Sequence, residues 1–111
     1  MIVLPLLAAV SLAGLAPADQ DDLRCLAYLS RAEAHTDGAL RMKVEAGALY
    51  YFGRIEARSP QLDIADALAG ILASPTYTHE VYEADKARCH AQLDPLAADF
   101  DHWRGTYRHG G

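Results

Sequence analysis

The chain of 111 residues lacks most of the features that identify a chemical activity. It contains no Cys-x-x-Cys redox motif, and no glycine-rich phosphate loop follows a strand pattern. It has no run of basic residues and a formal net charge of −5, so nucleic acid is not expected as a partner. No segment after the first 18 residues is apolar enough to cross a membrane. The sequence therefore predicts neither an enzyme nor a cofactor.

Charged side chains are also absent from the first 18 residues. Ile2 to Leu15 is a mostly apolar run with the length of a signal-peptide core, and it is shorter than the about 20 residues that span a bilayer. Ala16-Pro17-Ala18 matches the small-x-small pattern that signal peptidase cleaves. We predict a signal peptide over 1–18, a single domain over 19–111 and a periplasmic or secreted location. The alternative is a buried N-terminal helix, since no Lys or Arg precedes the run.

The chain has only two cysteines, Cys25 and Cys89, which allow one intramolecular pairing. In an oxidising compartment we expect them to form a disulfide. Closing a loop of about 65 residues stabilises a fold by roughly 4 kcal/mol in the chain-entropy model. The alternatives are two free thiols or bridges between chains.

The composition of the remaining chain predicts an all-α fold, because Ala and Leu are abundant and no stretch alternates apolar and polar residues for long. We predict a small helical bundle of four to five helices stapled by the Cys25–Cys89 disulfide. Ser59 is expected to cap a third helix that begins at Pro60. Asp94-Pro95 is expected to break or kink the fourth helix, and residues 108–111 should form a disordered tail. The expected helices cover 21–33, 39–58, 60–73, 78–93 and a last segment from 96.

Two aromatic patterns are candidates for a contact surface. The cluster Leu49-Tyr50-Tyr51-Phe52 points in nearly all directions on a helix, so either this helix is central and buried all round, which we favour, or one tyrosine faces out. In the last segment, Phe100, Trp103 and Tyr107 form an amphipathic stripe. We favour docking of this stripe on the bundle, and the alternative is a partner-binding or dimerisation face. The candidate contact residues are thus Tyr50, Tyr51, Phe100, Trp103 and Tyr107.

The segment His79-Glu80-Val81-Tyr82-Glu83 is similar to the zinc-protease motif His-Glu-x-x-His, but Glu83 replaces the second histidine. A metal site needs at least three converging ligands. On one helix His90 would lie about 16 Å along the axis from His79, too far to share an ion with it. We predict no metal site and no catalytic residue.

The segments Cys25-Leu-Ala-Tyr-Leu, Gly47-Ala-Leu-Tyr-Tyr-Phe-Gly-Arg-Ile, Pro60 and Arg88-Cys89 give the chain a resemblance to a group of proteins. It resembles small exported helical proteins with two cysteines from alphaproteobacteria. That group has no assigned activity, so the resemblance transfers no functional residue. In architecture the chain is also similar to periplasmic acid-stress chaperones of the Hde type, which are small, helical, exported and held by one disulfide.

These observations favour a non-enzymatic exported protein that binds other proteins, in its most concrete form a chaperone-like or stress-related one. Acidification would neutralise 15 carboxylates and leave 10 Lys and Arg and 5 His cationic, which would loosen the bundle. The alternative is an inhibitor or immunity-type protein for one exported enzyme. A remote alternative is a metal protein or enzyme that uses His79, Glu80 or Glu83. The protein partner is unidentified, and a homodimer is a further alternative.

Overall fold

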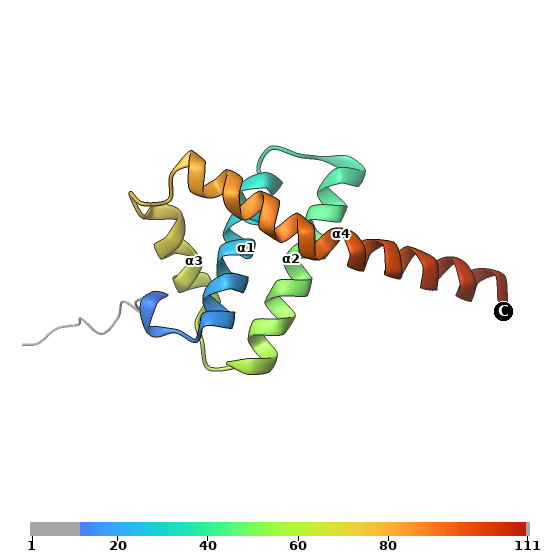
Figure 1. The fold of residues 1–111 in the computed structure, drawn as a ribbon, viewed down its shortest axis with the longest axis horizontal. Helices are drawn as coiled ribbons and strands as arrows, with labels where there is room; N and C mark the ends of the chain where they lie inside the picture. The colour runs from blue at the N-terminus through green and yellow to red at the C-terminus, as the bar shows by residue number, and fades with distance from the viewer. Residues whose placement is uncertain (1–11, 111) are drawn as a thin grey trace, which may run out of the picture.

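The computed structural model describes residues 12–110 and contains four α-helices (Figure 1). Among these residues there is no strand, so the predicted all-α bundle is confirmed. Residues 1–11 of the predicted signal peptide lie outside the described part of the chain. None of the helices within 12–110 combines the length and the apolar character needed to cross a membrane. The elements are a 3-10 helix η2 (Leu12–Gly14), α1 (Pro17–Glu33), α2 (Gly38–Arg58), α3 (Ile64–Ala73) and α4 (His79–Gly110).

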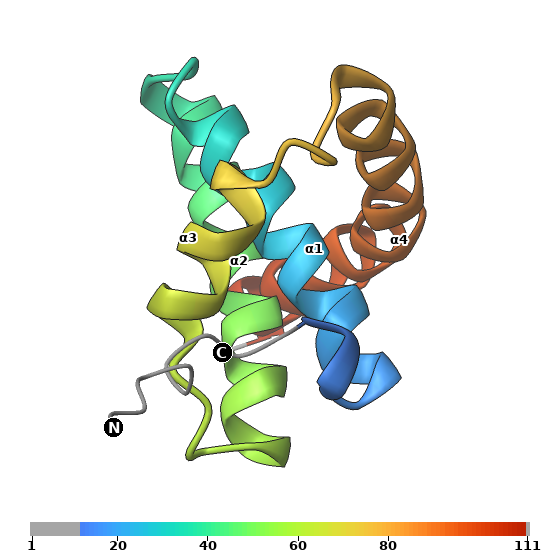
Figure 2. The ribbon, with the colours of Figure 1, turned by 90° about the vertical axis from the view of Figure 1, so that its left-hand side faces the viewer.

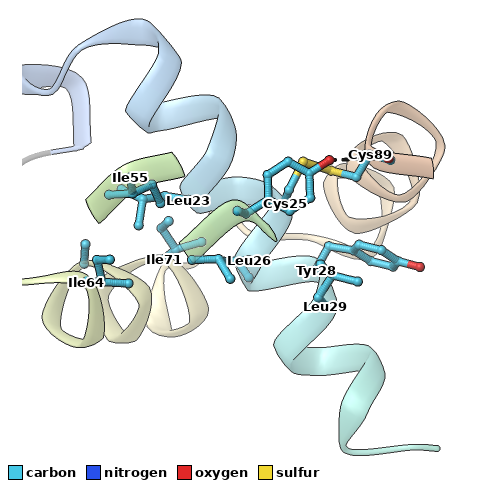
Figure 3. Close-up of a cluster of buried hydrophobic side chains, with 12 residues drawn as sticks. Leu23, Cys25, Leu26, Tyr28, Leu29, Ile55, Ile64, Ile71 and Cys89 are labelled. Atoms are coloured by element: carbon cyan, nitrogen blue, oxygen red, sulfur yellow. Dashed lines mark hydrogen bonds between the residues drawn. A yellow bond between two sulfur atoms is a disulfide. The ribbon is translucent and has the colours of Figure 1, made fainter. Parts of the chain in front are cut away.

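Helix α1 is the centre of the fold. Figure 2 shows it between α2 and α3 on one side and α4 on the other, and it contacts all three. Because α1 is covered on several sides, apolar positions around most of its circumference are buried. They include every residue of the uncharged run from Cys25 to Leu29 (Figure 3). The sequence pattern favoured α2 as the central helix, and this prediction is wrong.

Helix α2 packs on α1 through one face only. Gly47, Tyr51 and Ile55 lie four residues apart and are the buried residues of this helix. A Cβ atom at Gly47 would lie 3.2 Å from a methyl group of Leu93 in α4 and 3.4 Å from one of Leu29 in α1. The absence of a side chain at Gly47 therefore allows three helices to meet closely at this point.

Helix α3 begins at Ile64, four residues later than predicted. Its N-cap is Asp63, whose carboxylate accepts a hydrogen bond of 3.0 Å from the Asp66 amide. Pro60 lies in the turn that precedes the helix. The predicted cap, Ser59, instead donates its hydroxyl hydrogen bond to Asp19 of α1 at 2.6 Å. An aspartate side chain caps as well as serine, and here it lies where the helix starts.

Helix α4 is a single helix of 32 residues with Pro95 inside it, so of the predicted break or kink at Asp94-Pro95 the break is wrong. A proline inside a helix leaves the carbonyl four residues earlier, here that of Ala91, without its N–H donor. Ala91 and Pro95 are both exposed, so water can hydrate that carbonyl. The helix continues to Gly110 and thus includes residues 108–110, which were predicted to be disordered. Its second half extends beyond the other helices and gives the molecule its long axis of 67 Å (Figure 1).

The predicted disulfide is confirmed: Cys25 of α1 and Cys89 of α4 are bonded, with their Cα atoms 5.7 Å apart. Both cysteines are fully buried (Figure 3). The bond joins the central helix to the last one across 64 residues of sequence.

Candidate protein-contact surface

The first half of α4 is fixed to α1 by polar side-chain pairs in addition to the disulfide. The Arg24 guanidinium donates two hydrogen bonds to the buried Asp85 carboxylate, at 3.1 and 3.2 Å. The Tyr28 hydroxyl lies 2.6 Å from Nε2 of His90. A bidentate ion pair between a guanidinium and a carboxylate restricts the relative direction of the two side chains as well as their distance. These contacts determine the direction in which α4 leaves the bundle.

Tyr51, a predicted contact residue, belongs to this internal anchor instead. Its side chain is fully buried, and its hydroxyl donates a hydrogen bond of 2.7 Å to Oε1 of Gln92 in α4. Burial, with a smaller contribution from the neighbouring Tyr50, raises the pKa of Tyr51 to about 12. Tyr50 is half-buried, and its hydroxyl accepts a hydrogen bond of 2.8 Å from Arg54. The prediction that Tyr51 contributes to an outer surface is therefore wrong.

Two buried carboxylates of α1 are paired with arginines of α2. Asp22 accepts hydrogen bonds from Arg54 at 3.0 Å and from Arg58 at 2.5 Å. Asp19 accepts from Arg58 at 2.9 Å and from the Ser59 hydroxyl at 2.6 Å. The Ser59 hydrogen bond, together with the Arg58 charge, lowers the pKa of Asp19 although burial opposes this. Both carboxylates thus hold α1 against α2, a role that the sequence did not indicate.

The second half of α4 carries four large apolar side chains that the described part of the bundle leaves exposed. Leu96, Phe100, Trp103 and Tyr107 are 40, 54, 56 and 73% exposed, and we call these four residues the contact face. The rings of Phe100 and Trp103 lie 5.5 Å apart, and those of Trp103 and Tyr107 lie 5.6 Å apart. The prediction that the stripe docks on the bundle is wrong, because this half of α4 runs beyond the other helices (Figure 1).

The contact face continues the same stripe of α4 that packs on the bundle. Successive members are spaced by four and three residues in alternation, which is the heptad pattern of helices that pack side by side. Cys89 is buried and Leu93 is half-buried, and from Leu96 onward the stripe is exposed. The members in order are Cys89, Leu93, Leu96, Phe100, Trp103 and Tyr107. The apolar spacing that is typical of packed helices therefore continues along α4 past the point where α1 and α2 cover it.

A groove of about 1240 Å³ lies beside the contact face, between α4 and the first half of α2. Tyr28 and Leu29 of α1 contribute to its lining, and Leu96 and Phe100 belong to both the groove and the contact face. On the α2 side the groove is lined by Leu40 and Met42, which are 58 and 70% exposed. Leu96 and Phe100 thus connect the contact face to the groove, whose lining also includes charged side chains such as Lys43, Lys86 and Asp99.

Two other exposed apolar side chains lie on α2 outside this surface. Leu49 is 70% exposed and Phe52 is 43% exposed, and neither lines the groove. Their exposure shows that α2 is amphipathic and not buried all round. Substitutions at these two positions therefore change exposed apolar side chains without touching the contact face.

The geometry around the histidines offers no converging set of metal ligands in the described residues. His79 is mostly exposed and lies 3.9 Å from Glu83 on the next turn. His90 lies in hydrogen-bond contact with Tyr28. Within residues 12–110, no three His, Cys, Asp or Glu side chains are grouped so that they could hold an ion.

Comparison of the chain with protein-family models, with curated proteins and with solved structures gives no match.

Proposed function

We propose that this protein is an exported, non-enzymatic protein-binding module that acts through the contact face and the adjoining groove. The observation that carries the proposal is the projecting half of α4, on which four large apolar side chains lie together and exposed. Contiguous exposed apolar surface that extends over several side chains is typical of sites for protein partners. The aromatic content supports this, because Trp and Tyr are enriched at the centres of protein interfaces.

The shape of the surface favours a helical or extended apolar segment as its ligand. An amphipathic helix can lie along the contact face and the adjoining groove and bury its apolar residues, which are spaced by three and four. In the chaperone-like version of the proposal, the ligand is an apolar segment of an unfolded protein. The buried disulfide supports export, since such bonds persist in oxidising compartments.

Trp103 makes the proposal directly testable, because it is the only tryptophan in the chain and belongs to the contact face. A synthetic amphipathic helix of Leu and Lys is added while the emission of Trp103 is followed. Binding at the contact face should shift this emission to shorter wavelength. The variant Phe100→Ser/Tyr107→Ser should bind at least about tenfold more weakly, since truncation of aromatic hot-spot residues costs about 2 kcal/mol or more. The control Leu49→Ser/Phe52→Ser removes two other exposed apolar side chains, outside the contact face, and should bind as the wild type does.

The chaperone-like version needs a second readout, the light scattering of citrate synthase as it aggregates on mild heating without reductant, so that the Cys25–Cys89 disulfide stays intact. Suppression by the wild type and by the control, but not by the contact-face variant, would support it. Peptide binding without suppression would leave a binding module with no chaperone-like role. Emission that stays unchanged at all peptide concentrations, with no effect on scattering, in a protein that sedimentation shows to be monomeric would overturn the proposed function.

A further inference from the structure

We infer that the contact face is completed by a second copy of this chain, with the projecting halves of the two α4 helices packed antiparallel. This inference rests on the proposed function, because it names the partner of the same surface. It is carried by three observations: the phase of the apolar stripe, the area of the exposed surface and the position of the bundle relative to the stripe.

The phase of the stripe makes the surface complementary to itself. In helices that pack side by side, residues spaced by three and four fill the spaces between the corresponding residues of the neighbour. The contact face has this spacing from Leu96 to Tyr107. A twofold axis across the stripe would bring the same patch of both copies together, as in most homodimers.

The area of the surface matches what a stable dimer needs. The groove side adds Leu40 and Met42 to the four residues of the contact face. With about 200 Å² for a large apolar side chain, the exposed fractions of these six residues amount to roughly 700 Å² per copy. A standard interface buries about 800 Å² per partner. One second copy can therefore cover most of the exposed apolar surface.

The position of the bundle selects the antiparallel orientation. In a parallel pair, the second helix would run beside Cys89 and Leu93, where α1 and α2 already contact the stripe. In an antiparallel pair, the second bundle lies beyond the free end of α4, where the described structure leaves space (Figure 1). If the twofold axis crosses the stripe between Phe100 and Trp103, Phe100 of each copy faces Trp103 of the other copy. It also brings the free end of each α4 toward the groove of the other copy.

The test measures the mass of the purified native protein by sedimentation equilibrium over a wide range of concentration. We expect twice the mass that the same sample shows as a single chain under denaturing conditions, whether or not residues 1–18 have been removed from the full chain of 12.1 kDa. Trp103→Glu should raise the dissociation constant at least about tenfold, because it places two charges in a desolvated contact. Leu49→Glu introduces the same charge at an exposed site of α2 outside the surface and should leave the dimer intact.

The orientation is tested by cysteine cross-linking, for which Cys25 and Cys89 do not compete because they are bonded and buried. In the antiparallel pair, Leu96 faces Tyr107 of the second copy. Leu96→Cys/Tyr107→Cys should therefore give covalent dimers, and Leu96→Cys alone should not. Efficient cross-linking by Leu96→Cys alone would show a parallel pair and overturn the orientation.

A wild-type protein that remains monomeric at all concentrations, or a dimer that persists in Trp103→Glu, would overturn the inference. The peptide assay separates this result from failure of the proposed function. A monomer whose Trp103 emission responds to the amphipathic helix retains the binding role without self-association. A monomer that does not respond excludes both.

Discussion

Removal of the disulfide is the most informative single perturbation, because the bond joins the central helix to the helix that carries the contact face. Cys25 and Cys89 are 64 residues apart in sequence. A loop of this length lowers the entropy of the unfolded chain enough to stabilise the folded state by about 4 kcal/mol. Domains of this size have unfolding free energies of about 5–15 kcal/mol, so the loss is a large share of the total. We expect Cys25→Ala/Cys89→Ala to fold only marginally.

The assay is urea unfolding followed by circular dichroism, on the wild type with and without reductant and on the double alanine variant. With a urea slope of about 1–3 kcal/mol per molar, a loss of about 4 kcal/mol should lower the midpoint by more than 1 M. The reduced wild type and the variant should unfold at similar urea concentrations, since both lack the same constraint. If either remains within about 1 kcal/mol of the oxidised wild type, the chain-entropy reasoning is refuted for this fold.

Four further predictions concern side chains inside the bundle, each measured by urea unfolding. Tyr77→Phe should leave stability unchanged or raise it by up to about 1 kcal/mol, because its buried hydroxyl has no hydrogen-bond partner among the described residues. Tyr51→Phe should lower the free energy of unfolding by about 1 kcal/mol, because it loses the hydrogen bond to Gln92. Equal changes in Tyr77→Phe and Tyr51→Phe would contradict both predictions. Asp22→Asn should lower the free energy of unfolding by about 2 kcal/mol. This is less than the about 3–5 kcal/mol lost when a fully buried ion pair is broken, because the arginine partners of Asp22 are a third or more exposed and stay hydrated. An unchanged free energy of unfolding would show that this carboxylate is dispensable. The folded-state pKa of Asp19 lies below its ordinary value of 3.8, so its stabilising effect is complete above that pH and is lost as the pH falls through the folded value. Stability should therefore fall between neutral pH and about pH 3 by more in the wild type than in Asp19→Asn, and equal losses would contradict the assignment.

The parts of the fold that depend on local sequence could be predicted from it. The helical composition and the even number of cysteines were enough for the all-α fold and for the Cys25–Cys89 bond. The bounds of α2 were also close to those observed, whereas α1 begins at Pro17, four residues before its predicted start. Predictions failed where two local signals competed, as at the start of α3. There, the Ser59-Pro60 pair is a strong helix-start signal, yet Asp63 is the cap. Ser59 instead donates a hydrogen bond to Asp19 of α1.

The parts that depend on how helices are placed in space could not be predicted. The pairing of Asp19 and Asp22 with Arg54 and Arg58 requires α1 and α2 to lie side by side, and no spacing in the sequence encodes that contact. The contact face shows the same limit. A stripe with helical spacing indicates that an apolar face will be covered, but not whether the chain's own bundle or another molecule covers it. Trp103 was therefore correctly placed in an apolar stripe, but the prediction that this stripe packs on the chain's own bundle was wrong.

The two halves of α4 differ in what they contribute to the molecule. The first half holds the disulfide, the buried Asp85 pair and the His90 contact, all of which attach it to α1. The second half leaves its aromatic side chains outside the described bundle, so it adds little hydrophobic stabilisation to the fold. Exposing three aromatic rings in water is unfavourable unless another molecule covers them. A helix that is attached to the bundle at one end and carries an apolar stripe at the other is suited to present a binding surface in a fixed direction, because the partner need not first order it.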